Sequence, residues 1–449
     1  MKAADWLRRA ALVNPEVVAV GDGREALSFA ELDGRTSEVA ARLVDQGVGG
    51  GSSAVLVLGE GLEKVVQIHA LIRIGVTVTP VERNLPGPEM TRVLATIEPD
   101  HVLGPEDGLT GPVVEREVRP DPGTSDPLCR IMTGGSTGTP KAIGLTAANH
   151  FTSAVGSAVN LGLEAEDRWL CAVPLSHVSG FTILIRSAIY GTGFFLADRF
   201  TPELLAGACR DRAVNTASLV PTMLGRILDG GHIPEGLRFA LIGGGPVPPD
   251  LILEASAAGI PVVPTYGLTE ACSQVATSTP RLALRQPGSA GPALPGAELR
   301  IEAGEILVRG PMVSHDAASP DGWLRTGDLG RVDDEGLLFV EGRADRAILS
   351  GGEKVDPVEV ESVLASHPEV AEVVVFGAPH PEWQQAVVAA VVPADGCRPS
   401  EERLIESCGQ ELAGFKVPKR VVLMASIPVT GAGKPDLEAM IARVTGSDP

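Results

Sequence analysis

Apolar and polar residues alternate along the first 260 positions in a pattern typical of strands that are followed by helices. Short apolar runs predict strands, and segments with apolar residues at helical spacing predict helices between them. The predicted strands are 54–58, 76–79, 128–131, 169–173, 194–197, 217–220 and 239–242, and the predicted helices are 62–74, 183–190 and two that begin near Pro221 and Pro249. Such alternation predicts a largely parallel α/β architecture.

The pattern changes twice in the second half of the chain. After Leu284, short strands such as 298–301 and 306–309 are separated by Gly, Pro and Asp, which predicts a smaller β-rich subdomain. Beyond 343–345 the pattern predicts a separate α+β unit. Its predicted elements are a helix at 357–365, strands at 370–376 and 387–392, and a helix at 401–412. We therefore predict two domains, 1–343 and 344–449.

Composition narrows the class of protein. The 449 residues carry a net charge of −20, which argues against nucleic acid or an anionic membrane as a partner. No segment has the length and hydropathy of a signal peptide or a membrane span, so we expect a cytoplasmic protein without an integral membrane part. The six cysteines are scattered without metal-ligand spacing, which predicts buried thiols in a reducing compartment.

A glycine-rich stretch at 132–146, MTGGSTGTPKAIGLT, is the first candidate for chemistry. Glycines permit close backbone approach, successive N–H groups can form an anion-binding nest, and Lys141 adds a positive charge. Polyphosphate is the ligand that such a loop suits best. The spacing differs from that of the Walker loop and of the dinucleotide-binding turn, because Lys141 follows a proline and no GxGxxG opens a helix. A flexible connector with a solvated lysine is the alternative.

Three further segments carry groups suited to a nucleotide. In 265–272, TYGLTEAC, Tyr266 can lie flat on a planar base and Glu270 can ligate a hard cation. The run Gly243–Gly245 follows a predicted buried strand, where α/β proteins open a ligand crevice. Asp328 follows a glycine and can accept from two ribose hydroxyls. Taken alone, TYGLTEAC is more often an ordinary strand-to-loop turn with surface polar residues, and the glycine run is also compatible with an ordinary turn before a helix.

Together these segments resemble the AMP-forming adenylating enzymes, the acyl-CoA synthetase and luciferase superfamily. The resemblance covers seven motifs in the family's order, from Met132 to the C-terminal PVTGAGK, and includes WLRTGD at 323–328, GRAD at 342–345 and SGGEK at 350–354. In the glycine-rich loop, Gly134 and Ala142 depart from the family's pattern. The resemblance implies an α/β fold with a large N-terminal domain of mixed and parallel sheets with helices, a β-rich subdomain, and a small mobile α+β C-terminal domain.

The resemblance also implies roles for individual residues. For nucleotide binding these are Thr133, Ser136, Thr137, Gly138, Lys141, Gly244, Tyr266, Asp328 and Arg343. Thr269 would contact phosphate and Glu270 would help hold Mg²⁺. For the acid they are Gly243, Gly245 and Gly267, and for CoA they are Gly351 and Gly352. Asp345 would be the pivot between the domains. Lys434 would bridge the carboxylate and the α-phosphate while the acyl-adenylate forms.

The segment 149–191 resembles the o-succinylbenzoate–CoA ligases of menaquinone biosynthesis. Its features include Asn149, His150, a histidine at 177 that can lie near the reacting acyl group, and an arginine at 186 in an otherwise apolar helix. A charged side chain in such a helix must meet an anion or reach solvent. Escape to solvent is the usual outcome on physical grounds alone. The resemblance implies instead that Arg186 pairs with the second carboxylate of a dicarboxylic acid, for which a guanidinium is well suited.

We therefore expect an ATP-dependent, Mg²⁺-requiring acid–CoA ligase that makes an acyl-AMP and transfers the acyl group to CoA. The best candidate for the acid is o-succinylbenzoate. The alternatives are a natural-product aryl- or acyl-CoA ligase, a ligase that loads a carrier protein, and a catalytically silent relative that binds nucleotide. A homodimer is among the assemblies compatible with the sequence.

Overall fold

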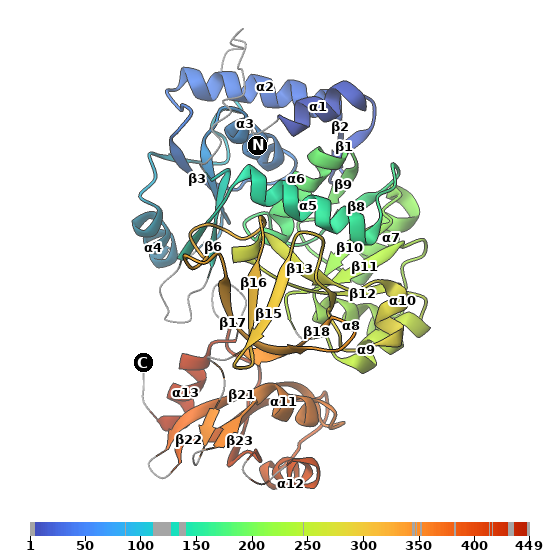
Figure 1. Ribbon diagram of the computed structural model, residues 1–449, viewed down its shortest axis with the longest axis vertical. Helices are drawn as coiled ribbons and strands as arrows, with labels where there is room; N and C mark the ends of the chain where they lie inside the picture. The colour runs from blue at the N-terminus through green and yellow to red at the C-terminus, as the bar shows by residue number, and fades with distance from the viewer. Residues whose placement is uncertain are drawn as a thin grey trace. The chain divides into compact units, whose positions relative to one another are not determined.

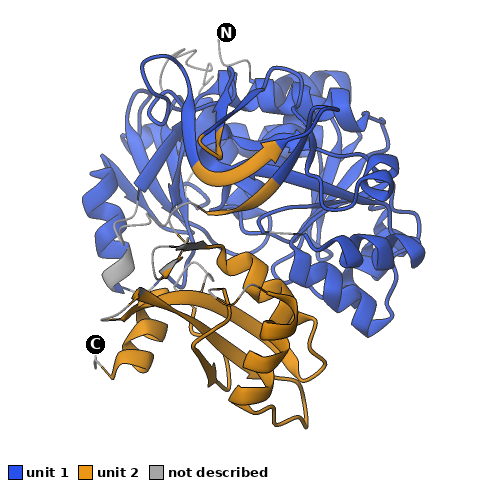
Figure 2. Cartoon of the chain, turned by 60° about the horizontal axis from the view of Figure 1, so that its bottom comes forward, with its two compact units in different colours: residues 1–302, 307–326, 332–339 blue, residues 303–306, 327–331, 340–449 orange. Residues whose placement is uncertain are grey.

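The computed structural model describes residues 5–85, 87–110, 127–133, 141–245, 247–343, 346, 348–350, 353–380, 383–412, 414, 416–429 and 435–446. The chain forms two compact units, coloured blue and orange in Figure 2. Unit 1 comprises Met1–Glu302, Leu307–Thr326 and Val332–Phe339, and unit 2 comprises Ala303–Ile306, Gly327–Arg331 and Val340–Pro449. The predicted boundary between residues 343 and 344 stays a prediction.

An eight-stranded sheet forms the larger part of unit 1, with the strand order β13-β12-β11-β10-β8-β9-β1-β2. Its inner strands from β12 to β1 are all parallel, and β13 and β2 close the two edges as antiparallel strands. The bounds are β1 Val18–Gly21, β2 Ala26–Ser28, β8 Arg168–Cys171, β9 Gly193–Leu196, β10 Thr216–Leu219, β11 Phe239–Ile242, β12 Val262–Leu268 and β13 Ser273–Thr277. The carboxyl ends of the parallel strands therefore meet at one edge.

Helices pack on both faces of this sheet, because its central strands are apolar on both sides. In β11, Phe239 and Leu241 join one core cluster and Ala240 and Ile242 join the other, as the two-residue period of a strand requires. The helices that precede, follow or connect these strands are α1 Trp6–Val13, α2 Phe29–Asp45, α5 Ala147–Leu161, α6 Val178–Tyr190, α7 Pro202–Arg212, α8 Pro221–Gly230, α9 Pro249–Ala257 and α10 Pro280–Arg285 (Figure 1).

A second sheet of unit 1 has the order β5-β3-β4-β6-β7. Its bounds are β5 His101–Leu103, β3 Ser53–Val57, β4 Thr77–Val81, β6 Cys129–Thr133 and β7 Lys141–Leu145, and its helices are α3 Glu63–Arg73 and α4 Gly87–Ile97. The first four strands are parallel, and β7 returns antiparallel to β6. This hairpin carries the glycine-rich stretch between its two strands.

The β-rich part after Leu284 is a third sheet, β14-β18-β17-β16-β15. Its strands are β14 Gly291–Pro292, β15 Glu298–Glu302, β16 Glu305–Arg309, β17 Leu324–Val332 and β18 Leu337–Arg343. Exposed and half-buried residues alternate along β15, and buried and exposed residues alternate at the start of β17, as is typical of antiparallel strands with one solvated face.

The rest of unit 2 is built on the sheet β20-β19-β22-β21, with β23 parallel to β22. The bounds are β19 Ile348–Ser350, β20 Glu353–Val355, β21 Val370–His380, β22 Gln384–Pro393 and β23 Arg420–Leu423, with helices α11 Pro357–Ala365, α12 Glu401–Glu411 and α13 Leu437–Thr445. Alternate residues of β21 and β22 pack on α11 and α12 or on α13, which gives this unit two core clusters.

The predicted fold class is confirmed. Each predicted strand and helix is present, and most boundaries agree within two or three residues. The main differences are an earlier start of α6, at Val178, longer strands at β21 and β22, and the additional strand β12. The ends of these strands lie in hairpins or antiparallel pairs, where cross-strand hydrogen bonds extend the strand beyond its apolar run. Among the described residues, no helix has the length and hydropathy needed to span a membrane.

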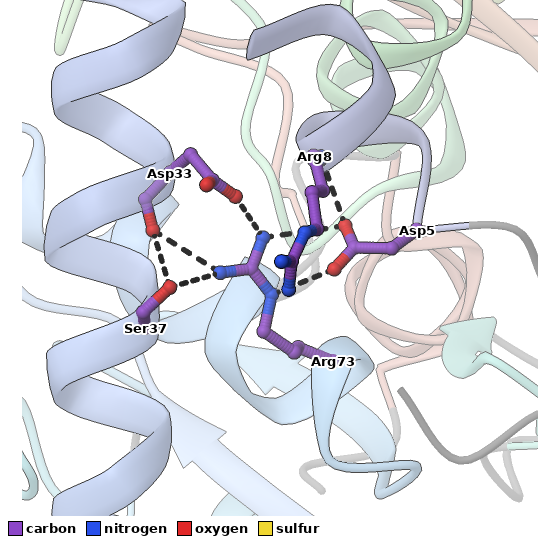
Figure 3. Close-up of polar contacts among 5 residues, drawn as sticks. All are labelled: Asp5, Arg8, Asp33, Ser37 and Arg73. Atoms are coloured by element: carbon purple, nitrogen blue, oxygen red, sulfur yellow. Dashed lines mark hydrogen bonds and ion pairs between the residues drawn. The ribbon is translucent and has the colours of Figure 1, made fainter. Parts of the chain in front are cut away.

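Arg73 at the end of α3 ties together three helices of unit 1 (Figure 3). Its Nε donates to Asp5 Oδ2 at 2.8 Å, one Nη donates to Ser37 Oγ at 2.7 Å, and the other bonds Asp33. Asp5 also caps α1 through the backbone N–H of Arg8. The Arg73 side chain is only 3% exposed, so its charge is compensated almost entirely by these two carboxylates.

We expect Arg73→Met to lower the free energy of unfolding by about 3 kcal/mol, the lower end of the range for breaking a buried ion pair. The lower end applies because Asp33 keeps 23% of its side chain exposed and can be rehydrated. Urea unfolding monitored by circular dichroism measures the change. Arg9→Met, which alters an exposed residue of α1, is the matched control. Equal stability of the two variants would contradict a stabilising role for this cluster.

Candidate active site

Several of the predicted site segments lie at the carboxyl ends of the parallel strands of the large sheet. The segment 172–177 follows β8, and Gly243–Gly245 follow β11. Tyr266 and Gly267 lie near the carboxyl end of β12. In α/β proteins this edge is where ligands bind, because strand ends and loops converge there. The topology thus brings together residues that are about 90 positions apart in the sequence.

The two ends of the glycine-rich stretch lie in the paired strands β6 and β7, and residues 134–140 between them lie outside the described residues. Thr133, the last residue of β6, is paired with Lys141, the first residue of β7. Thr133 Oγ1 donates to the Lys141 carbonyl at 3.4 Å. Lys141 is exposed. Ser136, Thr137 and Gly138 lie outside the described residues. The hairpin therefore presents a threonine hydroxyl and a lysine at the two ends of the predicted phosphate loop.

The glycine of the segment TYGLTEAC lies within a strand and not in a tight turn. β12 continues through Leu268, and its register with β13 shifts between Tyr266 and Gly267. A Cβ on Gly267 would lie 1.8 Å from the Ser273 carbonyl oxygen. Glycine is therefore required here by the close approach of the neighbouring strand in a β-bulge.

The bulge is followed by a short 3₁₀ helix, Thr269–Ala271, which displays Glu270. Tyr266 is 8% exposed, whereas the Glu270 side chain is half-buried. Among the described residues, none forms an ion pair with the Glu270 carboxylate. An uncompensated carboxylate at the end of a strand fits the oxygen ligand set of Mg²⁺.

The glycines after β11 carry no side chains at the end of this strand, which lies between β10 and β12. The N–H of Gly243 donates to the Leu219 carbonyl of the neighbouring strand, and a Cβ on Gly243 would lie 2.9 Å from Thr265 Cγ2. Gly244 has φ +79°, a conformation that glycine adopts without strain. The absence of side chains thus keeps this strand end close to the residue before Tyr266.

His177 is exposed and precedes α6 as its N-cap residue. Its loop folds tightly onto the helix, because a Cβ on Gly180 would lie 2.2 Å from the Pro174 carbonyl oxygen. The preceding residue, Ser176, donates to Glu82 Oε1 at 2.6 Å. The glycine in this HVSG segment therefore fixes the path of the loop that carries His177.

Arg186 does not escape to solvent. It lies in α6 with 4% of its surface exposed, and its guanidinium is held by side chains of β13 and α5. Nη1 donates to Gln274 Oε1 at 2.7 Å, and Nη2 donates to Ser153 Oγ at 2.9 Å. Neither partner carries a charge. No carboxylate of the described residues forms an ion pair with Arg186.

A histidine bridges two buried thiols beside this arginine. His150 Nε2 is 3.5 Å from Cys129 Sγ and His150 Nδ1 is 3.3 Å from Cys272 Sγ. Burial, reinforced by the positive charge of Arg186, lowers the pKa of His150 to about 3. Burial also raises the pKa of Cys272 to about 12 and raises the pKa of Cys129 well above its usual value. The imidazole and both thiols are therefore neutral at pH 7.

This burial predicts acid-sensitive stability. The unfolded chain takes up a proton on His150 near pH 6.5, whereas the folded protein does so only near pH 3. The contribution of His150 to the free energy of unfolding is therefore fully present above pH 6.5. It falls as the pH decreases, by up to about 1.4 kcal/mol per pH unit. Burial lowers the pKa of His69 to about 4, so this residue also makes the protein less stable as the pH decreases.

Urea unfolding between pH 6.5 and pH 5 measures this dependence. We expect His150→Gln to reduce the slope by about one proton. His315→Gln, at an exposed position, is the matched control and is expected to keep the wild-type slope. If His150→Gln also keeps that slope, His150 is protonated in the folded protein.

Asp328 and Arg343, both in unit 2, are brought together by the pairing of β17 and β18. Arg343 Nη1 lies 3.3 Å from Asp328 Oδ1. Gly327 has φ +71°, and a Cβ there would lie 3.3 Å from the Arg343 guanidinium. Asp345, Gly351, Gly352 and Lys434 lie outside the described residues.

Two functional candidates emerge only from the structure. Gln274 and Ser153 hold Arg186, yet they lie 88 and 33 residues from it in the sequence. The only sequence signal for Gln274 is its place two residues after the TYGLTEAC segment. Asn149, named among the specificity features, completes the capping box of α5 with Thr146 and donates to the carbonyls of Pro311 and Val313.

Comparison with known families assigns most of the chain. The AMP-binding enzyme family matches residues 7–122 and 105–315, and the AMP-binding enzyme C-terminal domain matches residues 359–434. A 2-succinylbenzoate–CoA ligase of Bacillus licheniformis is 36% identical over 97% of this chain and 98% of its own length.

Solved structures of the o-succinylbenzoate CoA synthetase MenE from Bacillus subtilis are similar at 33% identity. Its complex with the acyl-adenylate OSB-AMP has a TM-score of 0.90 and covers 96% of both chains. Its complex with ATP and magnesium also gives 0.90, covering 96% of this chain and 98% of the other. A double mutant bound to the product analogue OSB-NCoA gives 0.74, with 97% of both chains covered.

Proposed function

Because this chain belongs to the AMP-binding enzymes and is an adenylate-forming acyl-CoA ligase, we propose that the acid it activates is o-succinylbenzoate. ATP and the acid give an acyl-AMP and pyrophosphate, and the thiol of CoA then takes the acyl group. This activity places the protein in menaquinone biosynthesis, in the cytoplasm. The relatives that act on or bind this acid span the whole chain.

The observation that carries the choice of acid is the buried, uncompensated charge of Arg186. A guanidinium that is removed from water and bonded only to neutral oxygens is costly unless an anion completes its environment. o-Succinylbenzoate has two carboxylates, so one can react with ATP while the other pairs with Arg186. A monocarboxylic acid leaves the charge uncompensated.

The first half-reaction is assigned to residues at the strand ends and in the hairpin. Tyr266 and Gly244 bind the adenine side, and Thr133, Lys141 and Thr269 contact phosphate oxygens, with Ser136, Thr137 and Gly138 in the same loop. Glu270 holds Mg²⁺, which neutralises phosphate charge. Gly243, Gly245 and Gly267 leave room for the acid, and His177 lies beside its reacting end. Catalysis then comes from positioning and charge neutralisation.

The residues assigned in unit 2 serve both half-reactions. Asp328 binds the ribose hydroxyls, and Arg343 contacts ribose or phosphate. Lys434 acts in adenylation and Gly351 and Gly352 face CoA, so the two sets must exchange places by a rotation about Asp345. The Bacillus subtilis protein gives support by analogy. Its OSB-AMP complex matches this chain with a TM-score of 0.90, and the OSB-NCoA complex of its double mutant matches with a TM-score of 0.74 at the same sequence identity. The structures of these two complexes therefore differ from one another.

A panel of acids tests the proposal. The purified protein is incubated with Mg·ATP, CoA and either o-succinylbenzoate, benzoylpropionate, which lacks the ring carboxylate, or benzoate. Pyrophosphate and acyl-CoA are measured separately. We expect kcat/KM for o-succinylbenzoate to exceed that for benzoylpropionate by about 30-fold or more. Equal use of the two acids overturns the proposed substrate, and pyrophosphate release without acyl-CoA indicates another acceptor thiol.

A further inference from the structure

The charge of Arg186 is maintained by a set of neutral partners. Its two hydrogen bonds go to the amide oxygen of Gln274 and the hydroxyl of Ser153. Acidic side chains are the usual partners of a buried arginine, and among the described residues none forms an ion pair with this one. The partners of Arg186 therefore accept hydrogen bonds from the guanidinium without neutralising its charge.

The titratable groups around Arg186 do not supply an anion either. Burial raises the pKa of the Cys272 thiol to about 12, even though the nearby arginine opposes this shift. The pKa of Tyr190 is also raised by burial against the same opposing effect. His150 is a neutral imidazole at pH 7. The local net charge on this side of α6 is thus that of the guanidinium alone.

The hydrogen bonds of Gln274 fix the orientation of its side-chain amide. Arginine can only donate, so Gln274 must present its oxygen to Arg186 and its nitrogen to Thr277 Oγ1, 3.2 Å away. Thr265 Oγ1 donates to the Ala276 carbonyl at 3.0 Å and lies 2.8 Å from Thr277 Oγ1. Thr277 therefore donates to Thr265, and the amide cannot flip without breaking the chain.

Ser153 is fixed in the same way. Its hydroxyl accepts from Arg186 Nη2 and donates to the Cys272 carbonyl at 2.7 Å. Each acceptor of the guanidinium is thus itself held by a hydrogen bond to another residue. Coupled hydrogen bonds of this kind in a buried network hold the two acceptors in one geometry.

Donors of the arginine are left over. A guanidinium has five N–H groups, and the two hydrogen bonds to Gln274 and Ser153 use only two of them. Nε is buried and has no partner among the described residues. An incoming carboxylate is the group that best fits such a remaining set, because it accepts two parallel N–H bonds and brings one negative charge.

We propose that Gln274 and Ser153 are positioning residues which hold Arg186 by neutral oxygens, so that its charge selects an acid with a second anionic group. This inference rests on the proposed function and names the residues that set its specificity. Gln274 also faces Gly267 directly across β12 and β13. The network therefore sets the distance between the anion-binding guanidinium and the strand that carries Tyr266.

The decisive feature is that residue 274 is an amide and not a carboxylate. In Gln274→Glu, a side chain of nearly the same shape pairs with Arg186 and neutralises it. We expect the KM for o-succinylbenzoate to rise about 100-fold, while the KM for benzoylpropionate and for ATP stays within about threefold of wild type. A purely structural role would change all three values together.

Two further variants keep the test independent of one substitution. Ser153→Asp brings a carboxylate to the other side of the guanidinium and is expected to give the same selective loss. Gln274→Met removes one acceptor and leaves the charge, so we expect a smaller rise in KM for o-succinylbenzoate, about tenfold. Gln46→Glu makes the same chemical change at an exposed position and is the matched control.

Thermal melting confirms that each variant is folded, and steady-state kinetics with the two acids give the result. The selective loss of o-succinylbenzoate in Gln274→Glu or Ser153→Asp, greater than in Gln274→Met, supports the proposal. Unchanged KM values, or equal losses with both acids, overturn it. These outcomes differ from failure of the proposed function, in which the wild-type protein itself does not distinguish the acids.

Discussion

Replacing Arg186 with leucine should raise the KM for o-succinylbenzoate by about 30-fold or more, and should affect benzoylpropionate much less. Loss of one partner from a desolvated charge pair costs about 2–5 kcal/mol, and each 1.4 kcal/mol is about tenfold in affinity. The side chain is 4% exposed and its partners in the protein are neutral. The charge removed is therefore one that only a substrate would compensate.

Steady-state kinetics with both acids measure this effect, and thermal melting separates it from loss of structure. Arg226→Leu is the matched control, because Arg226 is an exposed arginine on a helix of the same unit. If Arg186→Leu weakens both acids equally, the arginine serves only the packing of α5, α6 and β13. The proposed acid would then lose its main support.

Lys434→Ala should slow formation of the acyl-adenylate by about 100- to 1,000-fold, the usual cost of removing one group that stabilises charge in the transition state. Conversion of pre-made acyl-AMP to acyl-CoA should stay close to the wild-type rate. The reason is that the proposed role of the ammonium group, between carboxylate and α-phosphate, exists only in the first half-reaction.

The two half-reactions are measured separately, as pyrophosphate release from ATP and as thioester formation from added acyl-AMP. Lys416→Ala is the matched control in unit 2. It removes an ion pair with Glu359, and neither residue is assigned to the proposed chemistry. Equal losses in both half-reactions for Lys434→Ala would falsify its assignment to adenylation.

The relation between these two variants follows from the division of the chain. Arg186 and its network belong to unit 1, whereas Lys434 belongs to unit 2. Arg186→Leu should therefore act on the choice of acid in both half-reactions, and Lys434→Ala on one half-reaction with every acid. Measuring both variants with both acids tests this independence, because substitutions without shared partners are expected to be additive.

The sequence by itself determined the order of strands and helices and the fold class. Short apolar runs and helical spacing are local signals, so β11 was predicted at its observed bounds and α11 likewise. The sequence also supplied the family, because its motifs are local as well. It placed Gly243–Gly245 after a strand, and the parallel topology then brings that strand end and the end of β12, which carries Tyr266, to one edge.

Only the tertiary structure decided how Arg186 is solvated. A lone arginine in an apolar helix is compatible with solvent exposure or with burial, and the sequence alone favoured exposure. Its burial depends on Gln274 and Ser153, which reach it from β13 and α5. The need for glycine at position 267 likewise comes from a neighbouring strand, at Ser273. Contacts between distant segments leave no periodic trace in the sequence, so these features appear only when the chain is folded.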